Sequence, residues 1–189
     1  FVEKMVLHVL CALFFDPHLP AEVKYGSLTV HGMNYLELLA NLRATSRFTR
    51  NFNTDPSLRD LANQSLDAVL MAVSIQYMQQ PAALFEEVRR VLRPGGVFIV
   101  SFSDRMFFTK AINAWTRQRS MTDLAKLVQS YFTDSGFLGV RAANRVGNVT
   151  VARSNPFLAV VGFRDEVPEG LLKQPSISWL QMSGRGSIW

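Results

Sequence analysis

Residues 65–105 have the sequence SLDAVLMAVSIQYMQQPAALFEEVRRVLRPGGVFIVSFSDR, and this stretch decides the fold. Its first part, residues 66–73, is almost continuously apolar, which is typical of a strand buried on both faces of a parallel sheet. Pro81 opens a helix, because the N–H that proline lacks has no partner in the first helical turn. A Pro-Gly-Gly turn ends this helix, and residues 97–102 form a second buried strand. The stretch is therefore a βαβ unit, whose crossover is right-handed in almost every protein.

The segments on either side of this unit continue the alternation of strands and helices. Before it, we expect strands over residues 5–13, 28–31 and 47–52, and a helix over residues 35–42. After it, residues 105–119 form an amphipathic segment compatible with a helix, and residues 122–135 indicate a clear helix. Two strands follow, over residues 137–146 and 157–163, joined by a long hairpin connection. The predicted fold class is α/β, a doubly wound sheet closed by an antiparallel edge.

Length and composition indicate one domain with a full hydrophobic core. The chain has 189 residues, of which 48% are hydrophobic. We expect residues 1–165 to form this domain and residues 166–189 to form a C-terminal extension. Within the extension, Leu171–Trp189 carries two tryptophans in an apolar setting, which is typical of a surface that docks on a protein partner.

The net charge of +5 is compatible with an anionic partner, either RNA or another anionic surface. Scattered, solvated arginines are the open alternative to a basic face built from Arg43, Arg47, Arg50, Arg141, Arg145, Arg153 and Arg164. Cys11 is the only cysteine, which excludes a disulfide framework and a cysteine-based zinc site, and no metal site is predicted. No apolar run is long enough to span a bilayer.

The central unit carries motifs that resemble those of a known family. They are Leu66-Asp67-Ala68-Val69 at the start of the first strand of the unit, Gln80-Pro81 at the start of the helix, and Glu87-Val88-Arg89-Arg90-Val91-Leu92-Arg93-Pro94-Gly95-Gly96 at its end. On these residues the sequence resembles the class I S-adenosylmethionine-dependent methyltransferases, and among them the methyltransferase type 11-like group. Segments 31–34, 51–53, 101–105 and 109–115 are similar to a plant and cyanobacterial branch of that group.

The resemblance covers residues 4–163 and implies a Rossmann-like, seven-stranded, mostly parallel sheet. The implied strand order is 3-2-1-4-5-7-6, with strand 7 antiparallel. The resemblance also implies S-adenosylmethionine as the cofactor. We expect an intracellular location, for which an organelle such as a chloroplast or mitochondrion is one option; no targeting segment is visible.

The resemblance places the cofactor at the carboxyl ends of the first four strands, where open α/β sheets bind their ligands. The residues of this chain that correspond to cofactor-binding positions are His8, Gly32, Met33, Asn34, Asn51, Phe52 and Ser74. Family members have a glycine-rich loop after the first strand and acidic residues for the ribose and the adenine. Here His8, Asn34 and Asn51 take the acidic positions, and no glycine follows His8 until Gly26.

These replacements weaken the expected cofactor site. The loss of two charged hydrogen bonds lowers affinity by ~10²- to 10⁴-fold, so we expect weak binding of S-adenosylmethionine. Other roles remain open for two of the residues: His8 as a hydrogen-bonded interior histidine, and Asn34 as a helix cap.

Catalytic residues cannot be assigned from the sequence, but Tyr77 and Asp104 are candidates. Tyr77 follows the fourth strand and is able to orient a nucleophile or act as a base, or to be a packed aromatic residue. Asp104 follows the fifth strand beside Arg105, with which a surface ion pair is the simpler role. We predict a non-catalytic structural subunit or scaffold of a larger assembly. The alternative is an active methyltransferase that acts on a small molecule or a protein.

Overall fold

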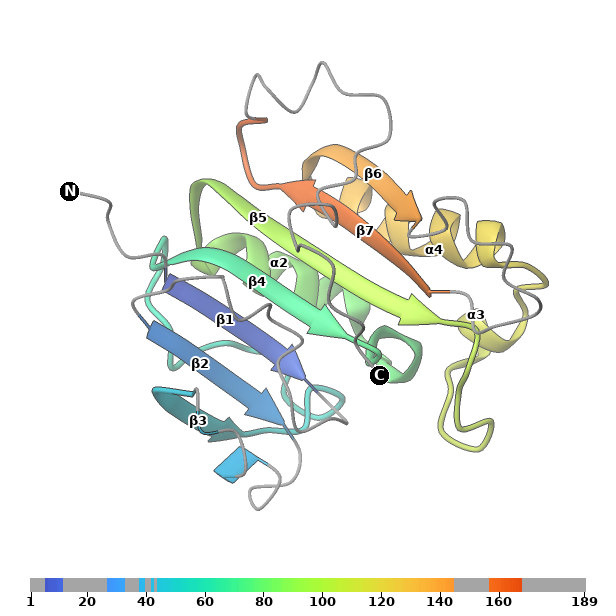
Figure 1. Ribbon diagram of the computed structural model, residues 1–189, viewed down its shortest axis with the longest axis horizontal. Coiled ribbons are helices and arrows are strands. Elements are labelled where there is room, and N and C mark those ends of the chain that lie inside the picture. The colour runs from blue at the N-terminus through green and yellow to red at the C-terminus, as the bar shows by residue number, and fades with distance from the viewer. Residues whose placement is uncertain are drawn as a thin grey trace.

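The computed structural model describes residues 6–11, 27–32, 38–39, 42, 44–144 and 157–167. Seven strands of this described part form one sheet in the order β3-β2-β1-β4-β5-β7-β6 (Figure 1). The strands are β1 Val6–Cys11, β2 Ser27–Gly32, β3 Ser46–Thr49, β4 Leu66–Ala72, β5 Leu92–Ser103, β6 Leu138–Asn144 and β7 Phe157–Phe163. All neighbouring pairs from β3 to β5 are parallel, whereas β7 runs antiparallel to both β5 and β6. The predicted fold class, with its strand order, is confirmed.

The helices of the described part are η1 Ile75–Tyr77, α2 Pro81–Val91, α3 Asn113–Thr116 and α4 Met121–Asp134. The two longer ones, α2 and α4, contact each other and lie on the same face of the sheet (Figure 1). Ser120 caps α4, because its hydroxyl accepts a hydrogen bond from the Asp123 N–H at 3.1 Å. None of the described helices is long and apolar enough to cross a membrane.

An aromatic cluster joins these two helices to the sheet. The ring of Phe85 on α2 lies 4.9 Å from Phe98 on β5 and 5.0 Å from Phe132 on α4, edge to face in both pairs. Phe137, just before β6, lies 5.2 Å from Phe132. Edge-to-face pairs at these centroid distances are favourable beyond their burial, so this cluster fixes how the helices cover the sheet.

The Pro-Gly-Gly turn lies inside a strand, not before one. Leu92 already pairs with Leu66, and the register then shifts so that Val97 pairs with Ala68. Gly95 has a φ of +73°, which side chains rarely adopt, and a Cβ on Gly96 would lie 2.8 Å from the Arg93 carbonyl oxygen. The strand therefore begins at Leu92 and not, as predicted, at Val97, and the turn is a bulge within β5.

Two other predicted elements are shorter than expected. The strand predicted over residues 47–52 ends at Thr49, because the chain turns at Asn51. In the segment 105–119 only Asn113–Thr116 is helical, because the N–H groups of Lys110 and Ala111 both bond to the Phe107 carbonyl and close a turn. Of the helix predicted over 35–42, the described residues 38–39 are helical and residue 42 lies in a turn. The docking segment predicted over residues 171–189 lies outside the described residues.

Candidate functional site

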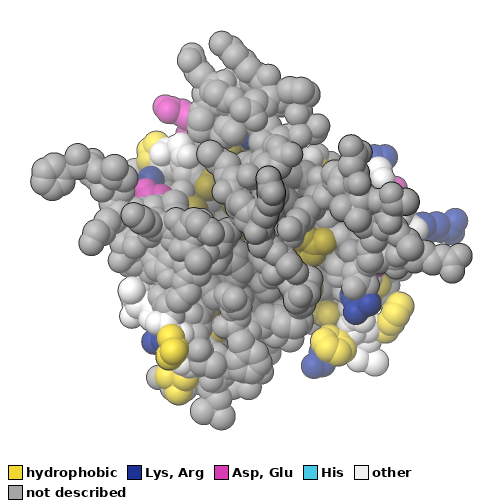
Figure 2. Space-filling model, viewed as in Figure 1, with side chains coloured by type: hydrophobic (Ala, Val, Ile, Leu, Met, Phe, Trp, Pro, Cys, Tyr) yellow, Lys and Arg dark blue, Asp and Glu magenta, His cyan; other side chains and the backbone are white. Residues whose placement is uncertain are grey.

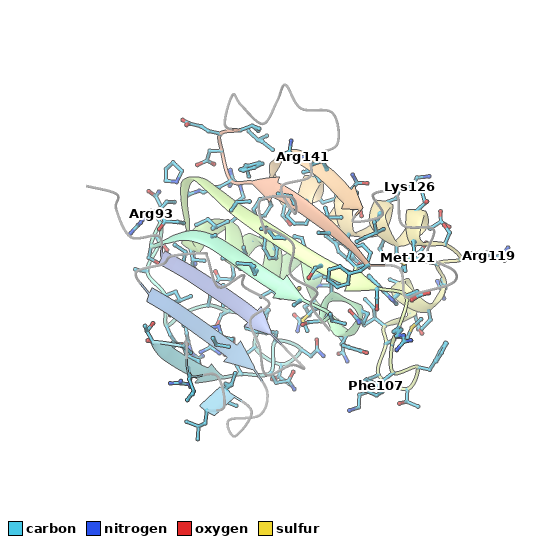
Figure 3. All side chains as sticks on the ribbon, viewed as in Figure 1. Arg93, Phe107, Arg119, Met121, Lys126 and Arg141 are labelled. Atoms are coloured by element: carbon cyan, nitrogen blue, oxygen red, sulfur yellow. The ribbon has the colours of Figure 1, made fainter. Side chains whose placement is uncertain are left out.

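Strands β1 to β5 are parallel and end at one edge of the sheet. Such carboxyl ends are where open α/β sheets bind ligands. The described part of this edge consists of the ends of the strands, the loop after β3, the loop after β4 and the loop after β5. Figure 3 shows side chains from these loops at the lower end of the sheet, with Phe107 at the far end of the last loop.

His31, in β2, is packed in an aromatic environment. It is fully buried, and its ring lies 5.0 Å from Phe48 and 5.6 Å from Phe52, perpendicular to the latter. Burial, and then the nearby positive charge of Arg50, lower the pKa of His31 from 6.5 to about 4, against a smaller opposite effect of Asp60. The imidazole is therefore neutral at neutral pH. Phe52, a predicted cofactor contact, covers this histidine and packs against the core.

Arg50 gathers the acidic side chains that follow β3. Its guanidinium forms an ion pair with Asp60, donates to the Ser57 carbonyl, and lies 3.7 Å from an oxygen of Asp55. Asp55 also pairs with Arg59 at 3.2 Å. The hydrogen bond from the Ser57 hydroxyl, at 2.6 Å, is the main reason that the pKa of Asp55 is lowered. Both carboxylates are thus occupied within the loop.

Asn51 ends β3 early by folding the chain back on itself. Its side-chain oxygen accepts the Asn53 N–H at 3.0 Å, and its carbonyl accepts the N–H groups of Thr54 and Asp55. Such local bonds compete with the hydrogen bonds of a strand, which is why the predicted strand does not reach residue 52. The side chain of Asn51 is exposed, but one lone pair of its oxygen is already used.

Asn53 clamps the loop after β3 to the loop after β4. Its side-chain nitrogen donates to the Tyr77 carbonyl at 3.0 Å, and its side-chain oxygen accepts the Gln79 N–H at 2.8 Å. The Asn53 carbonyl accepts a bond from the Gln80 side chain at 2.9 Å. We assigned Asn53 no role from the sequence. Its partner Tyr77 lies 24 residues further along the chain, and a contact over that distance leaves no local pattern in the sequence.

The end of β4 has an uncommon backbone. Val73 has a φ of +47°, which is a genuine outlier for a β-branched residue, and its N–H bonds to the Ser101 carbonyl at 2.8 Å. Ser74, a predicted cofactor contact, is buried, and its hydroxyl donates to the Ala72 carbonyl at 2.6 Å. The serine hydroxyl thus holds the turn that the strained residue begins.

Gln76 places a polar group in the interior beside this turn. Its side chain is fully buried and donates to the Arg105 carbonyl at 3.3 Å, while its side-chain oxygen has no hydrogen-bond partner. Trp115 on α3 is also buried, with an indole N–H that has no partner. Buried polar atoms are normally satisfied, so each of these two atoms calls for an explanation.

The two catalytic candidates occupy different settings. The Tyr77 hydroxyl accepts the Phe107 N–H at 3.0 Å and so supports the loop after β5. Asp104 is exposed, and the described residues include no ion pair between it and Arg105. Instead, the Arg105 N–H bonds to the Ser103 hydroxyl at 3.2 Å. The structure therefore gives Tyr77 a positioning contact and leaves Asp104 at the surface.

The remaining predicted contacts are only partly visible. His8 lies in the middle of β1, in register with Thr29 and Val69, and Gly32 is the last residue of β2. Met33 and Asn34 lie outside the described residues, as does the loop after β1. Within the described part of the chain, no group of three or more histidine, cysteine or acidic side chains could hold a metal ion.

The arginines of the predicted basic face are largely used inside the molecule. Arg47 donates to the Leu38 carbonyl at 2.8 Å, and Arg164 binds the Leu92 carbonyl and pairs with Asp165 at 3.2 Å. Arg50 is held by the loop acids, as described above. Backbone carbonyls and acids close in space take up donors of these three residues, which leaves them less available for a basic face. Arg43, Arg145 and Arg153 lie outside the described residues.

S-adenosylmethionine needs acceptors for its adenine amino group and its ribose hydroxyls. Near the ends of β2, β3 and β4, the described residues offer two amide oxygens, on Asn51 and Gln76, whereas Asp55 and Asp60 are paired with arginines. A neutral amide is a weaker acceptor than a carboxylate. The acceptors described at this edge are therefore mainly neutral amides and paired carboxylates, and we derive no reaction step that involves the cofactor.

Comparison with known proteins agrees with the fold. Residues 21–100 match the model of the family described as a methyltransferase domain, type 11. No curated protein matches the sequence. Among solved structures, a chain of the complex between the Haloferax volcanii Trm112 methyltransferase activator and the putative methyltransferase is 18% identical, with a TM-score of 0.59, over 88% of this chain and 85% of that one.

Two further solved structures differ in what they are described to be. An S-adenosylmethionine-dependent methyltransferase from Mesorhizobium loti is 14% identical, with a TM-score of 0.57, over 86% of this chain and 92% of that one. The [4+2]-cyclase SpnF is 14% identical, with a TM-score of 0.61, over 87% of this chain and 77% of that one. The resemblance to class I S-adenosylmethionine-dependent methyltransferases is confirmed, and the fold by itself does not fix the reaction.

Proposed function

We propose that this chain, which has the class I methyltransferase fold, is a methyltransferase-like protein that binds S-adenosylmethionine weakly and serves as a structural subunit or scaffold of a larger assembly. The observation that carries the proposal is the pairing of the acids beside the expected adenine position. Asp55 and Asp60 form ion pairs with Arg50, whose side chain is largely buried, so a ligand donor would have to compete with this guanidinium for either carboxylate.

The neutral residues at this edge do not replace those acids. The Asn51 oxygen already accepts the Asn53 N–H, so it can accept only one further bond. Releasing Asn51 to turn toward a ligand would also loosen the turn after β3, which Asn53 joins to the loop after β4. Binding would therefore have to break existing hydrogen bonds, and this lowers the net gain.

A role in an assembly is supported by one of the similar structures. The Haloferax volcanii protein of similar fold is a putative methyltransferase in complex with a methyltransferase activator. In the present chain, we propose Leu171–Trp189 as the segment that docks on a partner, because it combines apolar side chains with two tryptophans.

The alternative is an active methyltransferase, and the end of β4 favours it. A strained Val73 and a buried, unpaired Gln76 oxygen at the carboxyl end of a central strand are the kind of feature that collects at functional sites. In that case the Tyr77 hydroxyl would lie beside the methyl acceptor, which would be a small molecule or a protein side chain.

The proposal is tested by restoring one lost acid. Equilibrium dialysis of the full chain against labelled S-adenosylmethionine should give weak binding, and Asn51→Asp should tighten it by about 10-fold, because a carboxylate accepts a stronger bond. Asn63→Asp adds the same charge to an exposed residue near Arg90 and should leave the affinity unchanged. Low-micromolar binding by the unaltered chain would sink the scaffold role, and no gain from Asn51→Asp would contradict the adenine position.

A further inference from the structure

The loop after β5 carries a concentration of positive charge. The segment from residue 105 to residue 119 contains no acid and four cations, which are Arg105, Lys110, Arg117 and Arg119. The nearest acids along the chain are the exposed Asp104 and Asp123, and the latter accepts a bond from the Ser120 hydroxyl at 2.7 Å. The segment therefore carries a net positive charge, and one exposed acid, Asp104, directly precedes it.

Two adjacent aromatic side chains form the tip of this loop. Phe107 is 58% exposed and Phe108 is 76% exposed. Figure 3 places Phe107 at the end of a loop that projects beyond the sheet, and Figure 2 shows hydrophobic side chains interspersed with Lys and Arg in the same part of the view. Exposed apolar side chains that are grouped and bordered by charges mark interaction sites more often than single exposed ones.

The tip is held in place by the rest of the fold. The Phe107 N–H bonds to the Tyr77 hydroxyl at 3.0 Å, and the Ile112 N–H bonds to the Gln76 carbonyl at 3.0 Å. Between them, the turn closed by the Phe107 carbonyl keeps the two phenylalanines outward. The ammonium group of Lys110 lies 5.6 Å from the centre of the Phe107 ring, so a cation sits directly beside the apolar tip.

We propose that the tip formed by Phe107 and Phe108 is a docking site for an anionic lipid membrane. Phenylalanine side chains insert at the boundary between headgroups and acyl chains, while neighbouring Lys and Arg contact lipid phosphates. The charges of the segment 105–119 are all positive, and the cation shown beside the tip, Lys110, suits the phosphates of a negative surface. A projecting tip also meets a plane without needing a matching cavity in a partner.

Single-stranded RNA is the nearest competitor, but the geometry favours it less. Base stacking needs an open ring face along a groove that follows the phosphate backbone. The Phe107 ring has Lys110 over one face and the Tyr77 ring 6.3 Å away, which leaves Phe108 as the one open platform of the tip. The membrane proposal rests on this surface alone and does not depend on whether S-adenosylmethionine binds. It would turn the carboxyl edge of the sheet, with Gln76 and Val73, toward the lipid.

The test is flotation of the full chain with lipid vesicles. Vesicles of phosphatidylcholine mixed with phosphatidylglycerol should carry the protein, vesicles of phosphatidylcholine alone should not, and added salt should weaken the binding. The double change Phe107→Ser and Phe108→Ser should lower the affinity on the order of 10- to 100-fold. Both side chains are exposed, so circular dichroism should show an unchanged fold.

A matched control separates the tip from general surface hydrophobicity. Leu42 is 91% exposed, more than either phenylalanine, and lies between β2 and β3, outside the tip. Leu42→Ser should therefore leave vesicle binding unchanged. Equal loss in both variants, undiminished binding of the phenylalanine variant, or no binding to either type of vesicle would overturn the proposal. Binding to a single-stranded RNA homopolymer that depends on Phe107 and Phe108, without vesicle binding, would assign the tip to RNA instead.

Discussion

Helix α2 with the motifs around it, and the loops at the carboxyl edge of β2 to β4, differ in how their backbone and polar groups are satisfied. Around α2, Glu87 and Arg90 pair twice at 2.8 Å, and Arg93 pairs with Asp67 at 2.8 Å. At the edge, Val73 has a strained backbone and Gln76 keeps an unpaired buried oxygen. The motif residues Glu87, Arg90 and Arg93 thus have structural partners, whereas the strained Val73 and the unpaired Gln76 oxygen lie at the edge where a ligand would bind.

The pair formed by Glu87 and Arg90 is the clearest example of a motif with a structural task. Glu87 accepts the Leu58 N–H at 2.7 Å, while Arg90 donates to the carbonyls of Leu58 and Leu61 at 3.0 and 3.2 Å. Helix α2 thereby holds the loop that leads into β4. A sequence match that depends on these residues indicates that the fold is kept, and says less about the cofactor.

Arg90→Ala should have the largest effect and would test the structural side of this comparison. It removes the donors to two carbonyls and leaves the half-buried Glu87 without its partner, so the free energy of unfolding should fall by about 2–4 kcal/mol. Urea denaturation measures this. Arg93→Ala is the control, because its ion pair with Asp67 is substantially exposed and should contribute less than about 1 kcal/mol. Equal effects of the two changes would contradict the clamp.

His31 should make stability depend on pH, because its pKa is lowered by burial. The folded state has a pKa of about 4 and the unfolded state 6.5, so the unfolded chain binds the proton first. The contribution is fully present above pH 6.5 and is lost as the pH falls from 6.5 to about 4. Between neutral pH and pH 5, the unaltered protein should lose about 2 kcal/mol more stability than His31→Phe.

The phenylalanine in this variant keeps the packing against Phe48 and Phe52. The difference is measured by urea unfolding of both proteins across this pH range, in which the other histidines cancel. If both proteins lose stability in parallel, His31 titrates normally. It would then belong with the solvent-accessible residues of the edge and not with the core.

Val73→Gly should have the smallest effect, and it tests the strain at the end of β4. Glycine adopts a φ of +47° freely, so relief of strain should offset the lost side chain and the flexibility of glycine. The stability should stay within about 1 kcal/mol of the unaltered protein. Val97→Gly makes the same change in the regular, half-buried part of β5 and should destabilise by about 2 kcal/mol. Equal losses in thermal unfolding would show that Val73 is not strained.

The sequence predicts the strands and the main helices well, because their signals are local. The apolar run predicts β4 to within one residue, Pro81 marks the start of α2, whose end at Val91 comes two residues early, and the resemblance supplies the strand order. The turn at Asn51 and the bulge at Gly95 were misplaced by a few residues. Local hydrogen bonds set the boundary at Asn51, and the pairing of Leu92 with Leu66 sets it at the bulge; hydrophobicity reveals neither.

The site was less predictable, because it depends on contacts between distant loops. Nothing near Asn53 in the sequence indicates that it binds the loop after β4, and nothing near Arg50 indicates that it occupies Asp60. The sequence correctly placed Tyr77 and Ser74 at the edge of the sheet. It did not show that the Tyr77 hydroxyl accepts the Phe107 N–H, or that the Ser74 hydroxyl donates to the Ala72 carbonyl. The position of a residue along a strand is readable from the pattern, whereas the partner of its side chain is not.

The most direct measurement is a calorimetric titration of the full chain with S-adenosylhomocysteine. This compound has the same adenine and ribose as the cofactor, so it reports on the two positions where acids are paired or replaced. We predict a dissociation constant weaker than about 100 μM, or no measurable heat of binding. A low-micromolar dissociation constant would contradict the account, since the edge of the sheet would then hold a complete cofactor site.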